Sequence, residues 1–298
     1  CNNIAIGRES GKGVTTGCCN ILLGTQVAAG SAITGIRNVV LGSSAGSNLT
    51  SGSENVFLGH SSGDQVTIGN KNVYLGEDAG QCQTTGCYNI ALGWIALRGS
   101  STPSNNTGRD NIAMGQYTGS EVTSGSYNIF LGTNSGKCTT TGSSNVFMGY
   151  YAGTNTTSSN AIAIGQEAGK GCAGSSGASN ISLGTSAGFG LSTGGCNILM
   201  GSCAGRTVTS SCYNVFIGHE AGRSSGGNVT GNKNVSLGYA ASCNITSGTE
   251  NVSIGQNAGR DISSGSYNVY LGSCAGNNIN SGSHNVMIGC NVEGASAT

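Results

Sequence analysis

A short pattern of apolar and polar residues recurs along the whole chain. It reads Asn, then Ile or Val, then a variable residue, then Leu, Ile or Met, then Gly, as in residues 55–59. The pattern occurs seventeen times, usually with a period of 17, and Ala161 is the one departure from Asn. If each repeat is numbered from its Asn as position 0, the apolar positions 1 and 3 have the spacing of a β-strand, not of a helix. A repeat of this kind predicts stacked coils.

We therefore predict an all-β fold: a parallel β-solenoid (β-roll) of about seventeen coils with a 17-residue repeat. It would form a single continuous domain over residues 1–298. The chain begins in mid-repeat and without Met, so we expect it to be a fragment of a longer fibre. Each coil would hold the strand, turns and a second short strand. Gly at position 4 of every repeat, and at position 8 of thirteen, predicts turns with positive φ or close backbone approach.

The two faces of the strand are both apolar. We predict that positions 1 and 3 line the core, which turns position 2 outward although it is often large. A strand with two apolar faces is usually covered on both, and a solenoid has only one interior. We therefore predict a homo-oligomer, with a row of tolerated aromatic side chains as the alternative. The predicted interface consists of the large side chains at position 2, namely Phe57, Tyr74, Phe130, Phe147, Leu199, Phe216, Tyr270 and Met287.

Two polar columns accompany the strand. Position 0 is Asn in sixteen of seventeen repeats, and the residue four before the next Asn is Thr or Ser in fifteen of sixteen cases. In stacked coils these side chains can hydrogen-bond from one coil to the next. The columns predict a stabilising role for the Asn. A regular Thr/Ser face would also suit an ice-binding β-solenoid, which is the alternative function.

The longest insertion runs from Asn89 to Asn111, where the period widens to 22. Insertions in repeat arrays map to surface loops and often to a binding face, although a neutral insertion is the alternative. This region supplies the candidate receptor loop, with Trp94, Arg98, Pro103, Asn105 and Arg109.

Cysteine and sequon positions bear on the compartment. Thirteen Cys in a chain with so few charges favour an oxidising exterior. Stacking suggests bridges of Cys1 with Cys18 and of Cys274 with Cys290, and one coil holds both Cys82 and Cys87. A free Cys acting as a small apolar filler is the alternative at each. Glycosylation sequons in a predicted loop position begin at Asn48, Asn155 and Asn244, although an Asn- and Thr-rich chain produces many sequons by chance.

Charge and composition exclude several function classes. The formal net charge is zero with no basic run, which makes nucleic acid and anionic membranes poor partners. No apolar run reaches the length of a membrane span. We find neither a nucleophile–base set nor paired metal ligands, and we predict no enzyme, no cofactor and no metal site. A polysaccharide-processing β-helix would need a groove of carboxylates, which the repeat does not supply.

Three repeats carry a resemblance to a known family. Asn-Ile-Ala-Ile-Gly at 3–7, Ala-Ile-Ala-Ile-Gly at 161–165 and Asn-Val-Ser-Ile-Gly at 251–255 resemble the head repeats of trimeric autotransporter adhesins. The longer unit, which continues with Ala-Gly and Thr-x-Gly, is similar to glycine-rich arrays of bacteriophage tail fibres, and the similarity covers essentially the whole chain. It implies parallel β-rolls that trimerise through apolar faces. The implied function is an extracellular fibre or adhesin shaft on a virion or cell surface, with a host receptor or glycan as partner.

Overall fold

The computed structural model describes residues 2–30, 32–102 and 105–293. It confirms the predicted class: an all-β parallel β-solenoid of about seventeen coils, in which each coil contributes one short strand from positions 1–3. The described residues form no α-helix. The chain divides into two compact units, residues 1–148 and 149–298, which we describe separately. A single continuous domain stays a prediction.

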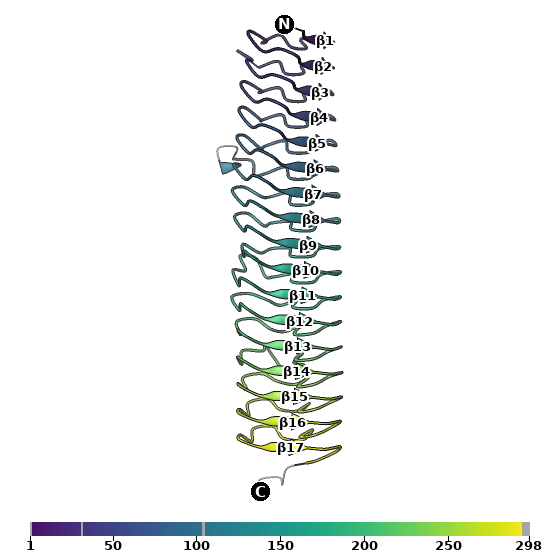
Figure 1. Ribbon diagram of the computed structural model, residues 1–298, viewed down its shortest axis with the longest axis vertical. Coiled ribbons are helices and arrows are strands. Elements are labelled where there is room, and N and C mark those ends of the chain that lie inside the picture. Colours follow the sequence, from purple (N-terminus) through teal and green to yellow (C-terminus); the bar gives the residue numbers. More distant parts are fainter. Residues whose placement is uncertain (1, 31, 103–104, 294–298) are drawn as a thin grey trace. The chain divides into compact units, whose positions relative to one another are not determined.

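Unit 1 contains nine parallel strands that stack in chain order (Figure 1). Neighbouring strands pair in register, so that Val56, Phe57 and Leu58 lie against Val73, Tyr74 and Leu75. The same repeat position therefore recurs directly above itself. The strands are β1 (Ile4–Ile6), β2 (Ile21–Leu23), β3 (Val39–Leu41), β4 (Val56–Leu58), β5 (Val73–Leu75), β6 (Ile90–Leu92), β7 (Ile112–Met114), β8 (Ile129–Leu131) and β9 (Val146–Met148).

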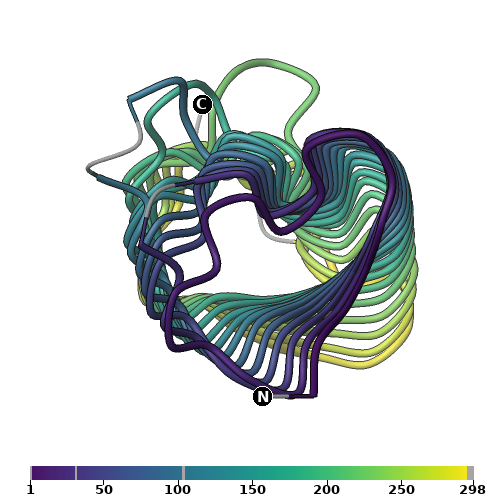
Figure 2. The same cartoon turned by 90° about the horizontal axis from the view of Figure 1, so that it is seen from above.

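Unit 2 repeats this arrangement with eight strands, again parallel and in register. Seen along the stack, the coils of each unit follow nearly the same closed path (Figure 2). The strands are β10 (Ile162–Ile164), β11 (Ile181–Leu183), β12 (Ile198–Met200), β13 (Val215–Ile217), β14 (Val235–Leu237), β15 (Val252–Ile254), β16 (Val269–Leu271) and β17 (Val286–Ile288).

The predicted assignment of the two strand faces is wrong. Position 2 points into the coil, and positions 1 and 3 point outward: in β4, Phe57 is 0% exposed while Leu58 is 47% exposed. The interior accepts rings because the facing wall of most coils is built from small residues, such as Ala221 and Ala258 at position 7. Branched residues at position 11, such as Ile245, complete the core. The residues predicted as the oligomer interface are therefore core residues: Phe57, Tyr74, Phe130, Phe147, Leu199, Phe216, Tyr270 and Met287.

Glycine at position 8 makes room for these rings. Gly63 has φ of +60°, and a Cβ built there would lie 2.8 Å from Cε2 of Phe57. Gly276 stands in the same relation to Tyr270, so a side chain at either position would enter the space of the ring. The predicted positive φ at positions 4 and 8 is confirmed at these turns. The Gly thus serves both the turn and the core.

The predicted second strand is reduced to isolated bridges. The described residues include only three, Val14 with Ile33, Thr156 with Ser175 and Val208 with Val229. The backbone in this part of the coil bends between coil-to-coil hydrogen bonds, such as Thr50 N–H to Thr67 O at 3.0 Å. These bonds hold the coils together, but the backbone here lacks the two consecutive extended residues that a strand requires.

The predicted Asn column is confirmed. Asn55 donates from its backbone N and its Nδ2 to Oδ1 of Asn38, at 3.0 and 3.1 Å, and Nδ2 also donates to the carbonyl of Gly69 at 2.8 Å. Asn72 repeats these bonds on Asn55. The Asn side chains are buried, so each bond forms away from competing water. A Thr column also forms, one residue before the predicted Thr/Ser column, because Thr50 Oγ1 donates to the carbonyl of Thr67 one coil on.

Candidate functional site

The outer face of the sheet is the principal candidate for a functional surface. We define it by the side chains at positions 1 and 3, which are Ile, Val, Leu or Met in every coil. They are half-buried to exposed along β1–β9 in unit 1 and along β10–β17 in unit 2. Among the more exposed are Leu58 and Met114 in unit 1, and Ile217 and Ile254 in unit 2. An apolar row of this length on each unit is unusual for a surface that faces only water.

The column at position −1 borders the outer face on one side. Its residues adopt the left-handed backbone conformation, with φ of 60° at Glu54 and 58° at Lys71. Their side chains interact from coil to coil: Glu54 forms ion pairs with Arg37 and Lys71, and Lys71 lies over the ring of Tyr88 at 5.2 Å. In unit 2 the ring of Tyr267 stacks on His284 with centroids 5.0 Å apart. This column is amphipathic and exposed.

The column at position 5 borders the outer face on the other side, just after the position 4 Gly. It is polar in most coils of unit 1, with exposed residues such as Ser43 and His60. Trp94 is the exception and is 42% exposed, and Tyr150 is exposed as well. Tyr239 in unit 2 stacks on His219 with centroids 5.4 Å apart. Polar and aromatic margins therefore flank an apolar centre, which is the usual composition of an interface rim and core.

The structure does not gather the predicted receptor loop into one site. Trp94 packs against Tyr117 at position 6 of the next coil, whereas Arg109 lies at position −2 and contacts Asp110 and Tyr127. Trp94 and Arg109 therefore belong to opposite margins of the outer face. Sequence proximity misled here because a coil turns back on itself within one repeat.

The inserted segment itself leaves the stack on a third side. Figure 1 shows the loop after β6 projecting away from the strands. Arg98 precedes it and stays in register, since its carbonyl accepts from Cys82 N at 2.8 Å. Asn105 is exposed in the loop, and Pro103 lies outside the described residues. The loop thus does not present Trp94, Arg98, Asn105 and Arg109 on a common surface.

The predicted disulfides do not form. Cys18, Cys82, Cys87, Cys274 and Cys290 are all free thiols, and Cys1 lies outside the described residues. Cys82 and Cys87 share a coil, but Cys87 Sγ accepts a hydrogen bond from Asn70 N of the preceding coil at 3.3 Å. Cys274 at position 6 and Cys290 at position 5 belong to different columns, and the latter is the more exposed.

Other cysteines behave as partly buried small side chains. Burial raises the pKa of Cys138 to about 11, and it also raises the pKa of Cys82 and Cys243. A raised pKa lowers the fraction of reactive thiolate at neutral pH. These three thiols are therefore poor nucleophiles, and they fit the alternative of a small apolar filler.

The three candidate glycosylation positions differ in access. Asn48 is exposed and its Nδ2 donates to the carbonyl of Asp64 at 3.1 Å. Asn155 is half-buried and has a left-handed backbone, with φ of 64°. Asn244 is half-buried and uses its amide in two side-chain hydrogen bonds. Asn48 is thus the most accessible, while modification of Asn244 would first break a small network.

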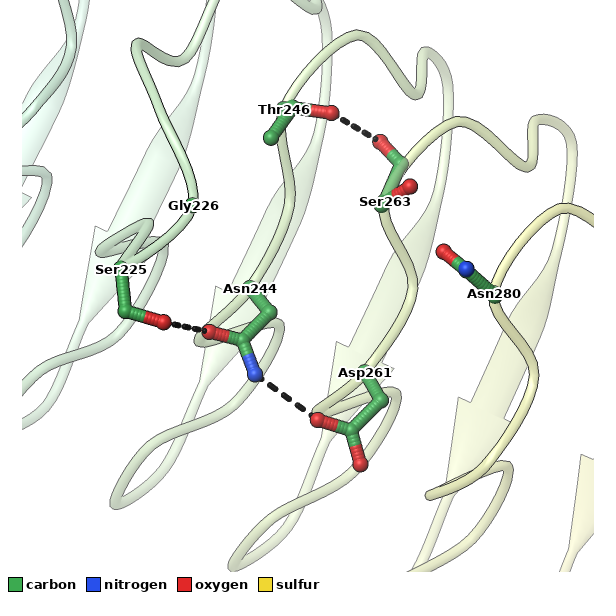
Figure 3. A pocket seen from close by; sticks show the side chains of 7 residues that line it. All are labelled: Ser225, Gly226, Asn244, Thr246, Asp261, Ser263 and Asn280. Carbon is green, nitrogen blue, oxygen red and sulfur yellow. Dashed lines mark hydrogen bonds between the residues drawn. The ribbon is translucent and has the colours of Figure 1, made fainter.

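That network lines an open groove of about 520 Å³ in unit 2 (Figure 3). Ser225 Oγ donates to Asn244 Oδ1 at 2.6 Å, and Asn244 Nδ2 donates to Asp261 Oδ1 at 2.8 Å. Thr246 Oγ1 donates to the carbonyl of Ser263 at 3.0 Å. The polar side chains of Ser225, Asn244 and Asp261 thus bond mainly to one another within the lining.

The described part of the chain contains no group of three or more His, Cys, Asp or Glu side chains placed to hold a metal ion. Residues 2–30, 32–102 and 105–293 include no helix both long and apolar enough to cross a membrane. Burial, and then the neighbouring Glu77 carboxylate, raise the pKa of Asp78, but Gln81 Nε2 already donates to this carboxyl at 2.9 Å.

The outer face was missed as a site in the sequence because its uniform Ile, Val and Leu residues have the composition of a core. The signal that could have located this face is the aromatic residues at positions −1 and 5, because exposed Tyr and Trp side chains border it on both sides. Comparison with protein-family models, with curated proteins and with solved structures gave no match.

Proposed function

We propose that this chain is the structural shaft of an extracellular fibre or adhesin, displayed on a virion or cell surface, and that it assembles as a homotrimer. The observation that carries the proposal is the outer face, an unbroken apolar row in each unit at positions 1 and 3. Three identical copies can turn one such face each toward a common axis, which closes the assembly and leaves no apolar row in water. The shaft supports or forms a surface that binds a host receptor or glycan.

The size of the face supports an oligomer over a monomer. Unit 1 has nine strands with two outward side chains each. Together they expose on the order of 1,000 Å² of apolar surface, against the few hundred Å² of a typical monomer patch. A stable interface needs about 800 Å² from each partner. One unit alone therefore provides enough surface for a partner copy.

The hydrogen-bond ladders that join successive coils suit a mechanical role. Asn, Thr and backbone groups bond each coil to the next, and the polar bonds of Asn38, Asn55 and Asn72 are buried. Because neighbouring coils make the regular contacts, a stack can be lengthened by repetition without a new kind of contact. We propose a non-enzymatic role on the same grounds, since the repeat builds length and surface, not a catalytic cleft.

An ice-binding function would use a regular Thr/Ser face, and two observations favour the shaft. Exposed Ile68 interrupts the predicted Thr/Ser column. In the column one residue before it, hydroxyls of Thr50, Thr123 and Thr246 donate to carbonyls of the following coil, so these side chains serve stacking.

The proposal is tested by the native mass of the protein. We expect a trimer by light scattering on a size-exclusion column, stable on dilution. Leu58→Asp with Leu75→Asp should reduce the mass while leaving the circular dichroism of the coils intact, because both side chains point outward from the strands. Ser51→Asp adds a charge at an exposed turn position of unit 1 and serves as the control. A monodisperse monomer of the unmodified chain would refute the proposal.

A further inference from the structure

Resting on the proposed function, we further infer that unit 1 carries a saccharide-binding patch centred on Trp94. The patch comprises Glu77, Trp94, Gln116, Tyr117 and Lys137. Trp94 is the only Trp of the chain and is 42% exposed. An exposed Trp at a position that is small and polar elsewhere in unit 1, as at Ser43 and Thr133, indicates a surface used for contact.

Backbone register places the patch residues on successive coils. Glu77, Trp94 and Gln116 all occupy position 5, after β5, β6 and β7. The carbonyl of Glu77 accepts from Ile95 N at 3.0 Å, and the carbonyl of Trp94 accepts from Tyr117 N at 2.9 Å. The three side chains therefore leave the stack at intervals of one coil, about 4.8 Å. The carboxylate, the indole and the amide form a short row.

The indole is held by its neighbour. The rings of Trp94 and Tyr117 meet edge to face, with centroids 5.0 Å apart and planes inclined by 60°. Lys137 Nζ lies 5.4 Å from the centroid of the Tyr117 ring and supports it from the next coil. A ring fixed in this way loses little further freedom when a ligand stacks on it.

Polar groups on both sides of the indole are free to bind. Neither the carboxylate of Glu77 nor the amide of Gln116 makes a side-chain hydrogen bond within the described part of the chain, and both residues are exposed. A carboxylate accepts hydrogen bonds, and an amide both donates and accepts. The patch thus offers an apolar plane between hydrogen-bonding groups.

A pyranose matches this arrangement. One side of a sugar ring presents C–H groups that pack on an aromatic plane, and its hydroxyls project around the rim toward donors and acceptors. Nucleic acid fits poorly because Glu77 repels phosphate and the chain has no net positive charge. The position 5 column is otherwise polar at Ser43, His60 and Thr133, so it suits a margin that remains in water when the outer face is covered. The patch is then accessible in the assembly.

The single Trp makes the test direct, because intrinsic fluorescence excited at the indole reports on this patch alone. The full chain is titrated with methyl pyranosides and short oligosaccharides of glucose, galactose, mannose and N-acetylglucosamine, and with sialyllactose. We expect at least one to change the intensity or wavelength of Trp94 emission saturably, with a Kd in the millimolar range that is usual for small contacts. Glu77→Ala and Gln116→Ala keep the indole and should each weaken that binding by about fivefold or more.

Trp94→Ala should abolish retention of the chain on the same saccharide immobilised on a resin. Tyr213→Ala, which removes an exposed aromatic ring from unit 2, should leave retention unchanged. An oligomer of the expected mass whose Trp94 emission responds to no saccharide in the panel would overturn this inference and leave the proposed shaft intact. A monomer would refute the shaft whatever the fluorescence shows. Equal binding by Glu77→Ala, Gln116→Ala and the unmodified chain would also overturn the patch.

Discussion

The ring of Tyr74 stacks on the ring of Phe57 with centroids 5.1 Å apart and planes inclined by only 8°. The two residues occupy position 2 of consecutive coils, and both are fully buried. Phe130 and Phe147 form a second stacked pair in unit 1, with centroids 5.5 Å apart. Coil stacking is therefore specified in the interior by rings as well as by the polar ladders.

Replacing one of these rings should weaken unit 1. Phe130→Ala removes a ring that is 0% exposed and leaves a cavity beside Phe147. The expected loss is about 3–5 kcal/mol in the free energy of unfolding, as for other buried Phe residues. Urea denaturation followed by circular dichroism measures it.

Ile129→Ala is the matched control, because it lies in the same strand on the outer face and is 36% exposed. Its effect on the unfolding of the coil should be smaller than that of Phe130→Ala. The reverse order would mean that the faces of β8 are assigned wrongly here.

The ladder of buried Asn side chains predicts a second loss of stability. In the structure Asn128 Oδ1 accepts from N and Nδ2 of Asn145, and Asn128 Nδ2 donates to Asn111 and to Gly142. Asn128→Ala removes these side-chain hydrogen bonds, and a buried group that loses its bond costs about 1–3 kcal/mol. We expect faster amide hydrogen exchange at Asn145 and a lower urea midpoint. Asn105→Ala, at an exposed loop residue, should change stability by less than about 0.5 kcal/mol.

The fold class, the strand positions and the Asn column could be predicted because they follow from strict periodicity. The direction of the faces could not be obtained that way, since a short strand with apolar side chains at positions 1, 2 and 3 has no polar face to mark the outside. One sequence signal favours the observed direction. Every repeat with Phe or Tyr at position 2 has Gly at position 8, whereas Ala91 at position 2 is paired with Leu97 at position 8. Such compensation of volume indicates shared space in a core.

The candidate site was predicted less well for a related reason. Its uniqueness in the sequence singles out Trp94, but closeness in sequence wrongly groups it with Arg109. In a solenoid, neighbours in space are about one period apart, as Trp94 at position 5 is to Tyr117 at position 6 of the next coil. Column positions, not loops, therefore locate surface patches in this fold.

Close backbone approach at position 4 predicts an intolerance to side chains. Gly238 has φ of +137°, and a Cβ built there would lie 2.5 Å from the carbonyl oxygen of Gly255 in the next coil. Gly238→Ala should therefore destabilise unit 2 by at least about 1–3 kcal/mol, the cost typical of a strained backbone conformation. Gly226→Ala is the control, because nothing lies within 4 Å of its added Cβ. Limited proteolysis of the two variants should differ, and equal resistance would contradict the close packing of the coils.

The buried hydroxyl of Tyr270 predicts an unusual dependence of stability on pH. Its Oη has no hydrogen-bond partner among the described residues, and burial raises the pKa of Tyr270 to about 12. Between about pH 10 and pH 12 the unfolded chain therefore releases a proton that the folded chain retains. Since the unfolded state then binds fewer protons, the free energy of unfolding falls as the pH rises through this window.

Tyr270→Phe should remove this contribution. At pH 7 it should be neutral or stabilise unit 2 by about 1 kcal/mol, because an unsatisfied hydroxyl leaves the core. Between pH 10 and pH 12 the variant should lose less stability than the unmodified chain, by about 2–3 kcal/mol, given about 1.36 kcal/mol for each unit of pKa shift. Urea midpoints at pH 7, 10 and 12 provide the measurement. Tyr213→Phe, at an exposed ring, should lose as much stability between pH 10 and pH 12 as the unmodified chain. If Tyr270→Phe loses as much as well, the Tyr270 hydroxyl ionises as freely in the folded chain as in the unfolded one.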